Sequence, residues 1–302
     1  MPVPGGLAIK DVSTWGLRVN FEEIRILTIT ALFSDDALYE QIVLKGGNAM
    51  SLVHRISLRS SLDLDFSLAS EFQDLPATQA RMERALVSRF ASVGLVPFDL
   101  KFAERPFSRN NFTAPRWGGY LLEFKLIAEK RFLAFGPEKG RLGREALVIG
   151  PNQMRIFTVD FSKWEYTEGK IRDDLDDYTI YVYSPGMIAV EKARAICQQM
   201  EEYRPAAKTK RARARDFFDI HTIVTKTGFS FASPESIDLA RLIFDAKDVP
   251  LLLLGRIKDQ REFHRADWPS VCGAVAEPLQ EFDFYFDFVL GEIEPLHALW
   301  ME

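Results

Sequence analysis

Hydrophobic and polar positions follow two different periods along the chain, and the change lies near residue 185. Before it, short apolar or alternating segments typical of β-strands are separated by segments with helical spacing. The expected strands span residues 41–45, 62–68, 97–102, 119–128, 154–161 and 178–183. The expected helices span 20–38 (one helix or two), 48–56 and 76–93, and a polar, glycine-containing stretch occupies 136–144.

The sequence Ser184-Pro185-Gly186 interrupts this alternation, because proline and glycine break regular structure. Beyond it helical spacing dominates, and helices are expected over 188–202, 212–227, 236–246, 250–263 and 278–290. A strand-and-helix half followed by a helical half favours an α/β or α+β domain joined to a helical one. We therefore predict one domain over residues 1–185 and a second, helical domain over 186–302.

Composition narrows the classes of protein to which the chain can belong. No apolar run approaches the roughly 20 residues of a membrane-spanning helix, and no N-terminal segment has the pattern of a signal peptide. Cys197 and Cys272 have no metal-ligand partners at usable spacing, so neither a disulfide framework nor a zinc site is expected. We expect a cytoplasmic protein with no membrane partner. The net charge of −5 is no nucleic-acid signature, so contact with a polyanion would need a local basic patch.

Two carboxylates lie two residues apart in the apolar segment 62–66, Leu-Asp-Leu-Asp-Phe. In a strand, Asp63 and Asp65 project from one face while Leu62, Leu64 and Phe66 face the core. Burying a charge without a partner is costly, so the pair indicates a ligand. Mg²⁺ suits it, because this hard cation favours oxygen ligands and substrate phosphates. The alternative is a half-exposed edge strand whose aspartates are solvated.

The segment Lys45-Gly46-Gly47-Asn48 lies where an expected strand passes into an expected helix. Glycines there let the backbone approach a phosphate closely, and a helix N-terminus offers free N–H groups and the positive end of its dipole. A plain turn would also account for the two glycines.

A third carboxylate would complete a cluster for two metal ions. Asp160 lies in the expected strand 154–161 and would join the pair if that strand neighbours the one carrying Asp63. Glu123, in the expected strand 119–128, competes with it. Position along the chain does not choose between them, and Asp160 is the preferred candidate.

The helical half carries further candidates. Lys192 lies among apolar residues, where its ammonium could reach a triphosphate as a point charge, or could instead extend along the helix surface to solvent. Asp216 and Asp219 share one helix face. A basic run precedes them, composed of Arg204, Lys208, Lys210, Arg211, Arg213 and Arg215. This local patch suits a nucleic-acid backbone, although a solvated loop with Arg–Asp pairs is the alternative.

In this order, KGGNAM, RSSLDLDF, a VEKARA helix and RARDFFDI resemble the AbiEii/AbiGii-type nucleotidyltransferase toxin family. That family belongs to the DNA polymerase β-like nucleotidyltransferase superfamily, and its pattern reads approximately KGGTAL, RFSEDLDF, an AEK-containing helix and RxKDxxDI/L. The matching segments extend from Lys45 to Ile220. The resemblance implies an α+β fold: a polymerase β-like domain with a mixed β-sheet, then a helical C-terminal domain that contributes Lys192 and Asp216 to the cleft.

Carried over residue by residue, the resemblance implies the following site. The implied nucleotide-binding residues are Lys45, Gly46, Gly47, Asn48, Lys192, Arg213 and Arg215. The implied catalytic residues are Asp63, Asp65, Lys192 and Asp216, and the implied metal ligands are Asp63 and Asp65, with Asp160 as the added candidate. Asp219 is expected to be more structural.

The chain departs from the family pattern at four positions. Asn48 replaces Thr or Ser, and its amide is expected to bind phosphate oxygens in place of the hydroxyl. Arg215 stands in for Lys, Leu62 for an acidic residue and Ser60 for an aromatic one. None of these changes removes a metal ligand.

The resemblance implies an enzyme that uses Mg²⁺ or Mn²⁺ to move NMP from an NTP to a hydroxyl, releasing pyrophosphate. The implied acceptor is RNA, with a tRNA 3′ end as one candidate, and the implied role is a toxin with a cognate antitoxin. A protein hydroxyl is an alternative acceptor, and a non-catalytic nucleotide-binding protein on the same fold is a further alternative. Glycosyltransferases also use a DxD motif, but they predict neither the glycine pair nor the downstream Lys and RxRD motifs.

Overall fold

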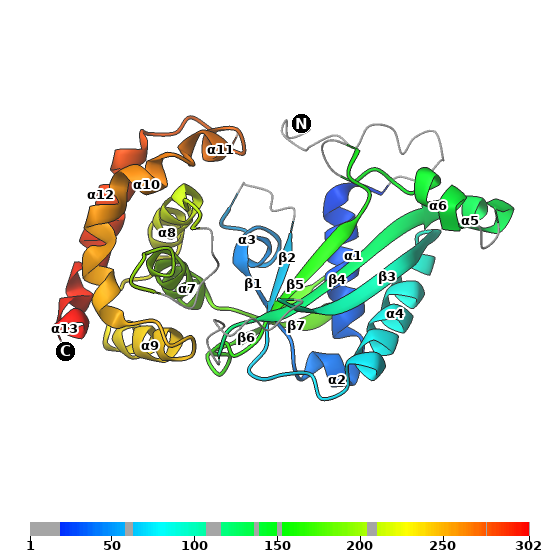
Figure 1. The fold of residues 1–302 in the computed structure, drawn as a ribbon, viewed down its shortest axis with the longest axis horizontal. Coiled ribbons are helices and arrows are strands. Elements are labelled where there is room, and N and C mark those ends of the chain that lie inside the picture. The colour runs from blue at the N-terminus through cyan, green and yellow to red at the C-terminus, as the bar shows by residue number, and fades with distance from the viewer. Residues whose placement is uncertain are drawn as a thin grey trace.

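A computed structural model describes residues 19–57, 63–106, 116–135, 139–149, 153–203, 210–275 and 277–301. Four residues discussed above, Ser60, Leu62, Arg204 and Lys208, lie outside these ranges. A sheet occupies the centre of the molecule, with the helical half to its left in Figure 1. The order of its strands is β3-β4-β5-β2-β1-β7-β6.

All six expected strands belong to this seven-stranded sheet. The strands are β1 (Val43–Lys45), β2 (Leu64–Ser67), β3 (Leu95–Arg105), β4 (Gly119–Ala128), β5 (Phe157–Ser162), β6 (Ile171–Leu175) and β7 (Tyr178–Val182). The pairs β1–β7 and β2–β5 are parallel, and the other neighbouring pairs are antiparallel. The α+β class and the mixed sheet are therefore confirmed.

Strand β6 was not expected, because its sequence IRDDL lacks the apolar alternation of a half-buried strand. It lies at the sheet edge, where charged side chains are common. Asp176 and Asp177 form the loop to β7, and both have positive φ angles, of 49° and 63°. Two such residues are typical of a type I′ hairpin turn.

The helices before residue 185 pack around the sheet. They are α1 (Phe21–Phe33), α2 (Asp36–Tyr39), α3 (Gly46–Asn48), a π-helical turn (Ala49–Val53), α4 (Leu75–Ala91), α5 (Glu129–Phe135) and α6 (Lys139–Glu145). Helix α6 occupies most of the stretch 136–144, for which only a polar segment was expected. A π-helical turn follows the glycines in place of the regular helix expected over 48–56.

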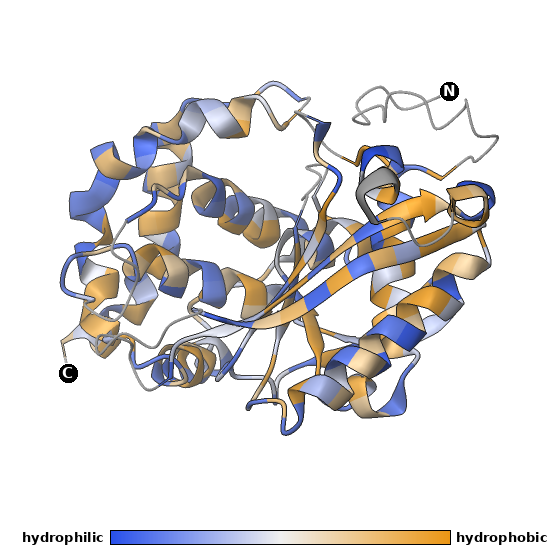
Figure 2. Ribbon diagram, turned by 45° about the vertical axis from the view of Figure 1, so that its right-hand side comes forward, coloured by the Kyte–Doolittle hydropathy of each residue, from blue (hydrophilic) through white to orange (hydrophobic). Residues whose placement is uncertain are grey.

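Aromatic side chains join α1 and α4 to the sheet. The ring of Phe21 in α1 lies 5.9 Å from that of Phe157 in β5, and Phe90 in α4 lies 6.1 Å from Phe124 in β4. Phe66 in β2 is fully buried, stacked 5.3 Å from Phe161. Figure 2 shows both hydrophobic and hydrophilic residues on the turns of α4, as expected of a helix with one buried face.

From Pro185 onward every described element is a helix. These are α7 (Pro185–Cys197), α8 (Ala214–Thr227), α9 (Pro234–Asp245), a 3₁₀ helix (Leu251–Gln260), α10 (Arg261–Arg265), α11 (Trp268–Cys272), α12 (Phe282–Ile293), a 3₁₀ turn (Glu294–Leu296) and α13 (His297–Trp300). The expected helix 250–263 is thus mainly 3₁₀. Ser184 caps α7 by accepting a hydrogen bond from the Met187 N–H, and Pro185 follows at the first helical position, where proline is favoured.

Helix α7 is the centre of this half and packs against α8, α9 and the 3₁₀ helix. Within the described ranges, no helix combines the length and the apolar character that crossing a bilayer requires. The division into two domains at residue 185 stays a prediction.

The substitution Phe66→Ala tests the core under the sheet. It should lower the free energy of unfolding by about 3–5 kcal/mol, because it leaves a cavity against Phe161. Urea denaturation measures the loss. Phe284→Ala is the matched control, since the ring of Phe284 is 47% exposed and its removal should cost less than about 1 kcal/mol. Equal losses would contradict this description of the core.

Candidate active site

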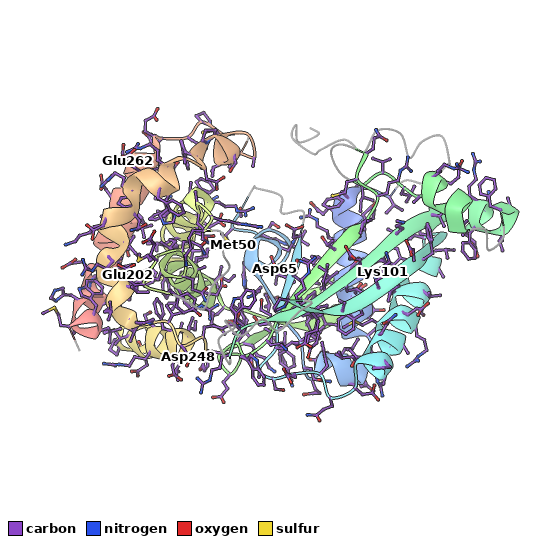
Figure 3. All side chains as sticks on the ribbon, viewed as in Figure 1. Met50, Asp65, Lys101, Glu202, Asp248 and Glu262 are labelled. Atoms are coloured by element: carbon purple, nitrogen blue, oxygen red, sulfur yellow. The ribbon has the colours of Figure 1, made fainter. Side chains whose placement is uncertain are left out.

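Three charged residues form one row across adjacent strands, and we call Lys45, Asp65 and Asp160 the charged row. Lys45 in β1 is directly opposite Asp65 in β2, and Asp65 is directly opposite Asp160 in β5. Directly opposite residues project from the same face of a sheet, with Cβ atoms about 5 Å apart. Leu64 and Phe66 point to the other face and are fully buried. In Figure 3, Asp65 lies between the sheet and the helical half.

Asp63 lies just before β2 and is exposed. Its carboxylate accepts a hydrogen bond of 3.4 Å from the Thr158 hydroxyl of β5. Glu123 is opposite Thr158 in β4, so it lies one strand farther from Asp65 than Asp160 does. The adjacency on which the preference for Asp160 depended is thus present. The choice between Asp160 and Glu123 as metal ligand stays a prediction.

The carboxylates repel one another across the row. Burial, together with the charges of Asp160 and Asp63, raises the pKa of Asp65 to about 6, although Lys45 opposes this shift. Burial and the charge of Asp63 also raise the pKa of Asp160, while Arg105 opposes the shift. Carboxylates that hold their protons more tightly than usual are a suitable oxygen donor set for a divalent cation, whose charge offsets the repulsion.

Among the described residues, however, no three His, Cys, Asp or Glu side chains are close enough together to form a ready metal site. The row therefore offers carboxylate oxygens that suit a divalent cation, from Asp63, Asp65 and Asp160. These oxygens do not converge on one common position.

Gly46 and Gly47 form a turn, the glycine turn, that lies against Asp65. Gly46 has a φ of +70°, and a Cβ added there would lie only 2.9 Å from Oδ2 of Asp65. An L side chain at this position would meet both backbone strain and the carboxylate. Gly46 therefore allows the turn to approach the charged row, and Gly47 follows it, buried at the start of α3.

The side chain of Asn48 forms hydrogen bonds to two segments of the protein. It is fully buried, its Oδ1 accepts a 2.8 Å hydrogen bond from Arg25 of α1, and its Nδ2 donates a 2.6 Å bond to the carbonyl of Asp63. Both ends of the amide are thereby used inside the protein. Asn48 fastens the glycine turn to α1 and to the segment that carries Asp63, and the expected binding of phosphate by its amide stays a prediction.

Lys192 of α7 lies between two carboxylates of α8. Its Nζ is 2.9 Å from Asp216 and 2.7 Å from Asp219, and all three side chains are buried. Asp216 also binds the Nε of Arg213 through its other oxygen. Burial alone would raise the pKa of Asp216, but Arg213 and Lys192 together hold it well below its usual range. The expected reach of Lys192 to a triphosphate stays a prediction, since its ammonium is engaged here by α8.

Arg213 connects this cluster to the charged row. Burial lowers the pKa of Arg213, whereas the carboxylates of Asp216, Glu191 and Asp65 raise it. The charge of Arg213 therefore interacts with that of Asp65. Its backbone N–H donates a 3.0 Å hydrogen bond to Nδ1 of His264. Burial lowers the pKa of His264 to about 4, so the imidazole is neutral at pH 7 and can accept this bond.

The remaining basic residues are divided between structural and exposed positions. Nζ of Lys210 donates to the carbonyls of Gln198 and Tyr203, at 3.3 and 3.0 Å. Arg211 and Arg215 are exposed. Of the expected nucleotide-binding residues in this segment, Arg213 is paired with Asp216 at the start of α8, while Arg215 is exposed.

Several charged residues near the row were not expected from the sequence. Arg105 ends β3, is 47% exposed and lies 3.8 Å from Asp160. Lys45 contacts Glu165 and Glu191, which also contact Arg194. Glu191 and Arg194 flank Lys192 in the VEKARA helix and could have been proposed from that position. Nothing in the spacing of Arg105 or Glu165 indicated a part in the site.

A mixed sheet thus carries paired aspartates beside a glycine turn, and the helical half contributes buried Lys and Asp residues. The sequence profile of the family described as nucleotidyl transferase AbiEii toxin, type IV toxin-antitoxin system, matches residues 28–288. The chain belongs to this family. It is therefore a nucleotidyltransferase, as the resemblance of its motifs implied.

Two solved structures resemble the chain at low sequence identity. JHP933 from Helicobacter pylori is 14% identical, with a TM-score of 0.46 over 96% of this chain and 94% of that one. An antigenic nucleotidyltransferase-like protein from Paracoccidioides brasiliensis is 13% identical, with a TM-score of 0.36 over 79% of this chain and 94% of that one. A search of curated proteins finds no match.

The substitution Asp65→Asn tests the repulsion within the row. A carboxyl whose pKa is raised to about 6 on folding favours the folded state below about pH 4, and this contribution is lost as the pH rises through 6. In the presence of a chelator, Asp65→Asn should therefore raise the free energy of unfolding by roughly 1–3 kcal/mol at pH 8 and by much less at pH 4. Urea denaturation at the two pH values measures this difference.

Asp238→Asn is the control for this test, because Asp238 lies on α9, outside the charged row, and its side chain is exposed. It should change the free energy of unfolding by no more than about 0.5 kcal/mol at either pH. An Asp65→Asn protein that is less stable than wild type at pH 8 would show that the row is not under repulsion.

Proposed function

We propose that the protein transfers a nucleoside monophosphate from an NTP to a hydroxyl group, with a divalent cation, Mg²⁺ or Mn²⁺, held by Asp63, Asp65 and Asp160. The observation that carries this proposal is the charged row, in which two carboxylates and a lysine share one face of three adjacent strands. A cation bound there would neutralise charge on the α-phosphate and on the departing pyrophosphate. Its charge would also offset the repulsion that adds to the effect of burial in raising the pKa of Asp65.

The glycine turn and two cations bind the phosphates in this proposal. The backbone N–H groups of Gly46 and Gly47 would bind a phosphate at the edge of the row, because Gly46 has no side chain to fill the space beside the carboxylate of Asp65. Lys45 lies opposite Asp65 and supplies positive charge for the β- and γ-phosphates, and Arg213, whose charge interacts with that of Asp65, supplies more. The ion pairs of Lys192 and Asp216 support a positioning role, because they hold Arg213 at the start of α8.

The reaction itself is an in-line displacement. The acceptor oxygen forms a bond to the α-phosphorus while the bond from that phosphorus to the bridging oxygen breaks, and pyrophosphate leaves with the electron pair. The proton of the acceptor hydroxyl passes to a carboxylate oxygen of Asp160, the carboxylate of the row that lies nearest to Arg105. Holding the two substrates in line supplies a large part of the rate.

The two ends of the charged row differ in solvent exposure. This difference supports an assignment of the NTP to one end and of the acceptor to the other. Lys45 is buried at 7% exposure against the helical half, whereas Arg105, beside Asp160, is 47% exposed. The NTP therefore binds at the Lys45 end, and the acceptor approaches over β4 and β3. An RNA acceptor, such as a tRNA 3′ end, is favoured over a protein hydroxyl, because Arg105 offers a cation to a backbone phosphate next to the attacking hydroxyl.

The family is that of type IV toxin-antitoxin systems, so the proposal includes a cognate antitoxin. The transfer would then modify RNA in the cell that makes the protein, and the antitoxin would counteract that effect.

Incubation of the purified protein with each α-³²P-labelled NTP, Mg²⁺ and total RNA tests the proposal. We expect labelled RNA, and a loss of label of at least 100-fold for Asp65→Ala, because the substitution removes the central carboxylate of the row. Total protein in place of RNA tests the alternative acceptor. A wild-type protein that binds NTP but labels neither RNA nor protein, with any nucleotide or metal, would refute the transfer.

Arg105→Ala tests the assignment of sides. The KM for the RNA acceptor should rise about tenfold, because a phosphate contact is lost, while the affinity for NTP should change less than about twofold. Steady-state kinetics with one labelled NTP separates the two effects. Arg84→Ala, a change on the distant helix α4, is the matched control. A rise in the KM for NTP alone would place the donor, and not the acceptor, at the Arg105 end.

A further inference from the structure

A buried carboxylate outside the charged row holds three cations. The side chain of Glu165, between β5 and β6, is 3% exposed. Its oxygens lie 3.3 Å from Nζ of Lys45, 2.8 Å from Nη1 of Arg194 and 3.5 Å from Nζ of Lys247. These cations come from β1, from α7 and from the residue that follows α9 and its C-cap. Burial would raise the pKa of Glu165, but Arg194, Lys45 and Lys247 together hold it well below its usual range.

Lys45 is the member of this cluster that reaches the charged row. It is opposite Asp65 in the β1–β2 pair and directly precedes the glycine turn. Its side chain is 9% exposed, and its long flexible stem would otherwise allow several positions for the ammonium. The carboxylates of Glu165 and Glu191 fix that position, the second at 3.6 Å.

Lys247 links Glu165 to the helical half. Its Nζ donates to the carbonyls of Lys163 and Arg116, both in the strand-containing half, in addition to its ion pair with Glu165. The carbonyl of Lys247 in turn accepts a 2.9 Å hydrogen bond from the hydroxyl of Tyr203. Glu165 is therefore bound at once by the strand that carries Lys45 and by two segments of the helical half.

Lys45 is the cation of this group that reaches both sites: it pairs with Glu165 and Glu191, and it lies opposite Asp65 of the charged row. The position of its ammonium is therefore fixed on the side where the proposed function places the phosphates of the NTP.

We propose that Glu165 is a positioning residue for nucleotidyl transfer, which fixes the Lys45 ammonium beside Asp65 and ties that position to the helical half through Arg194 and Lys247. This inference rests on the proposed function, since Lys45 is assigned there to the phosphates. Glu165 itself lies in the protein interior and acts through Lys45.

Glu165→Gln tests the inference, because it keeps the size of the side chain and removes its charge. With labelled NTP and RNA, kcat/KM should fall about 100-fold, and the KM for NTP should rise at least tenfold, because the ammonium that binds the phosphates is no longer held. If the substitution only reduced the fraction of folded protein, the apparent kcat would fall and the KM for NTP would stay unchanged. Glu165→Asp, which restores the charge on a shorter stem, should recover part of the affinity for NTP.

A double-mutant cycle identifies Lys45 as the residue through which Glu165 acts. In a Lys45→Met background, Glu165→Gln should lower kcat/KM no more than about threefold further, because the group it positions is already absent. The matched control is Glu71→Gln. Glu71 also forms an ion pair with a buried lysine, but that lysine is Lys163, at 2.8 Å, and not Lys45, so this substitution should leave kcat and KM unchanged.

Calorimetric titration of each variant with NTP and Mg²⁺ separates this inference from the proposed function. If wild type binds NTP but transfers nothing, the proposed function fails, and weaker binding by Glu165→Gln still supports the positioning of Lys45. If folded Glu165→Gln binds NTP and transfers as wild type does, the inference is overturned. Equal losses in the wild-type and Lys45→Met backgrounds would also overturn it. Circular dichroism checks the fold, and Glu165→Asp replaces the glutamine variant should that one not fold.

Discussion

The register of β2 against its two neighbours is the constraint on which the site depends. Side chains alternate between the faces of a strand, so a slip of one residue would turn Asp65 into the core and expose Phe66. The stacking of Phe66 on Phe161 opposes that slip, because it fixes β2 against β5 on the buried face. The same register places Asp65 between Lys45 and Asp160 on the other face. The hydrophobic core thus holds together carboxylates that would otherwise move apart.

Electrostatics connects the two halves of the chain around this row. Lys192 and Arg213 neutralise the acidic residues of α8, while Glu165 neutralises cations from both halves. Buried ion pairs of this kind add little net stability, but removing one partner leaves an uncompensated charge at a cost of about 3–5 kcal/mol. Their effect is therefore mainly to define one arrangement of the helical half relative to the sheet.

The sequence was sufficient for features with a local cause. The alternation of Leu64, Asp65 and Phe66 predicted which side chains face the core, and the break at Ser184-Pro185 marked the start of α7. The motif order predicted the family. These inferences depend on periods and breakers that act within a few residues.

Contacts between distant residues could not be predicted from the sequence. The amide of Asn48 has the chemistry to bind a phosphate, and only the fold shows its hydrogen bonds to Arg25 and to the Asp63 carbonyl. The ion pairs of Lys192 with Asp216 and Asp219, 24 and 27 positions away, likewise appear only in the fold. Glu165 is separated from Lys45 by 120 residues. No spacing rule connects such positions, because tertiary packing alone brings them together.

The contact between Arg25 and Asn48 has an evolutionary consequence. Asn48 stands where the family pattern has a hydroxyl residue, and its longer amide provides the acceptor that the buried guanidinium of Arg25 uses. A relative with Thr or Ser at this position would lose that acceptor, since the shorter side chain also has to reach the Asp63 carbonyl. The two positions should therefore covary among homologues, with arginine at the first accompanying asparagine at the second.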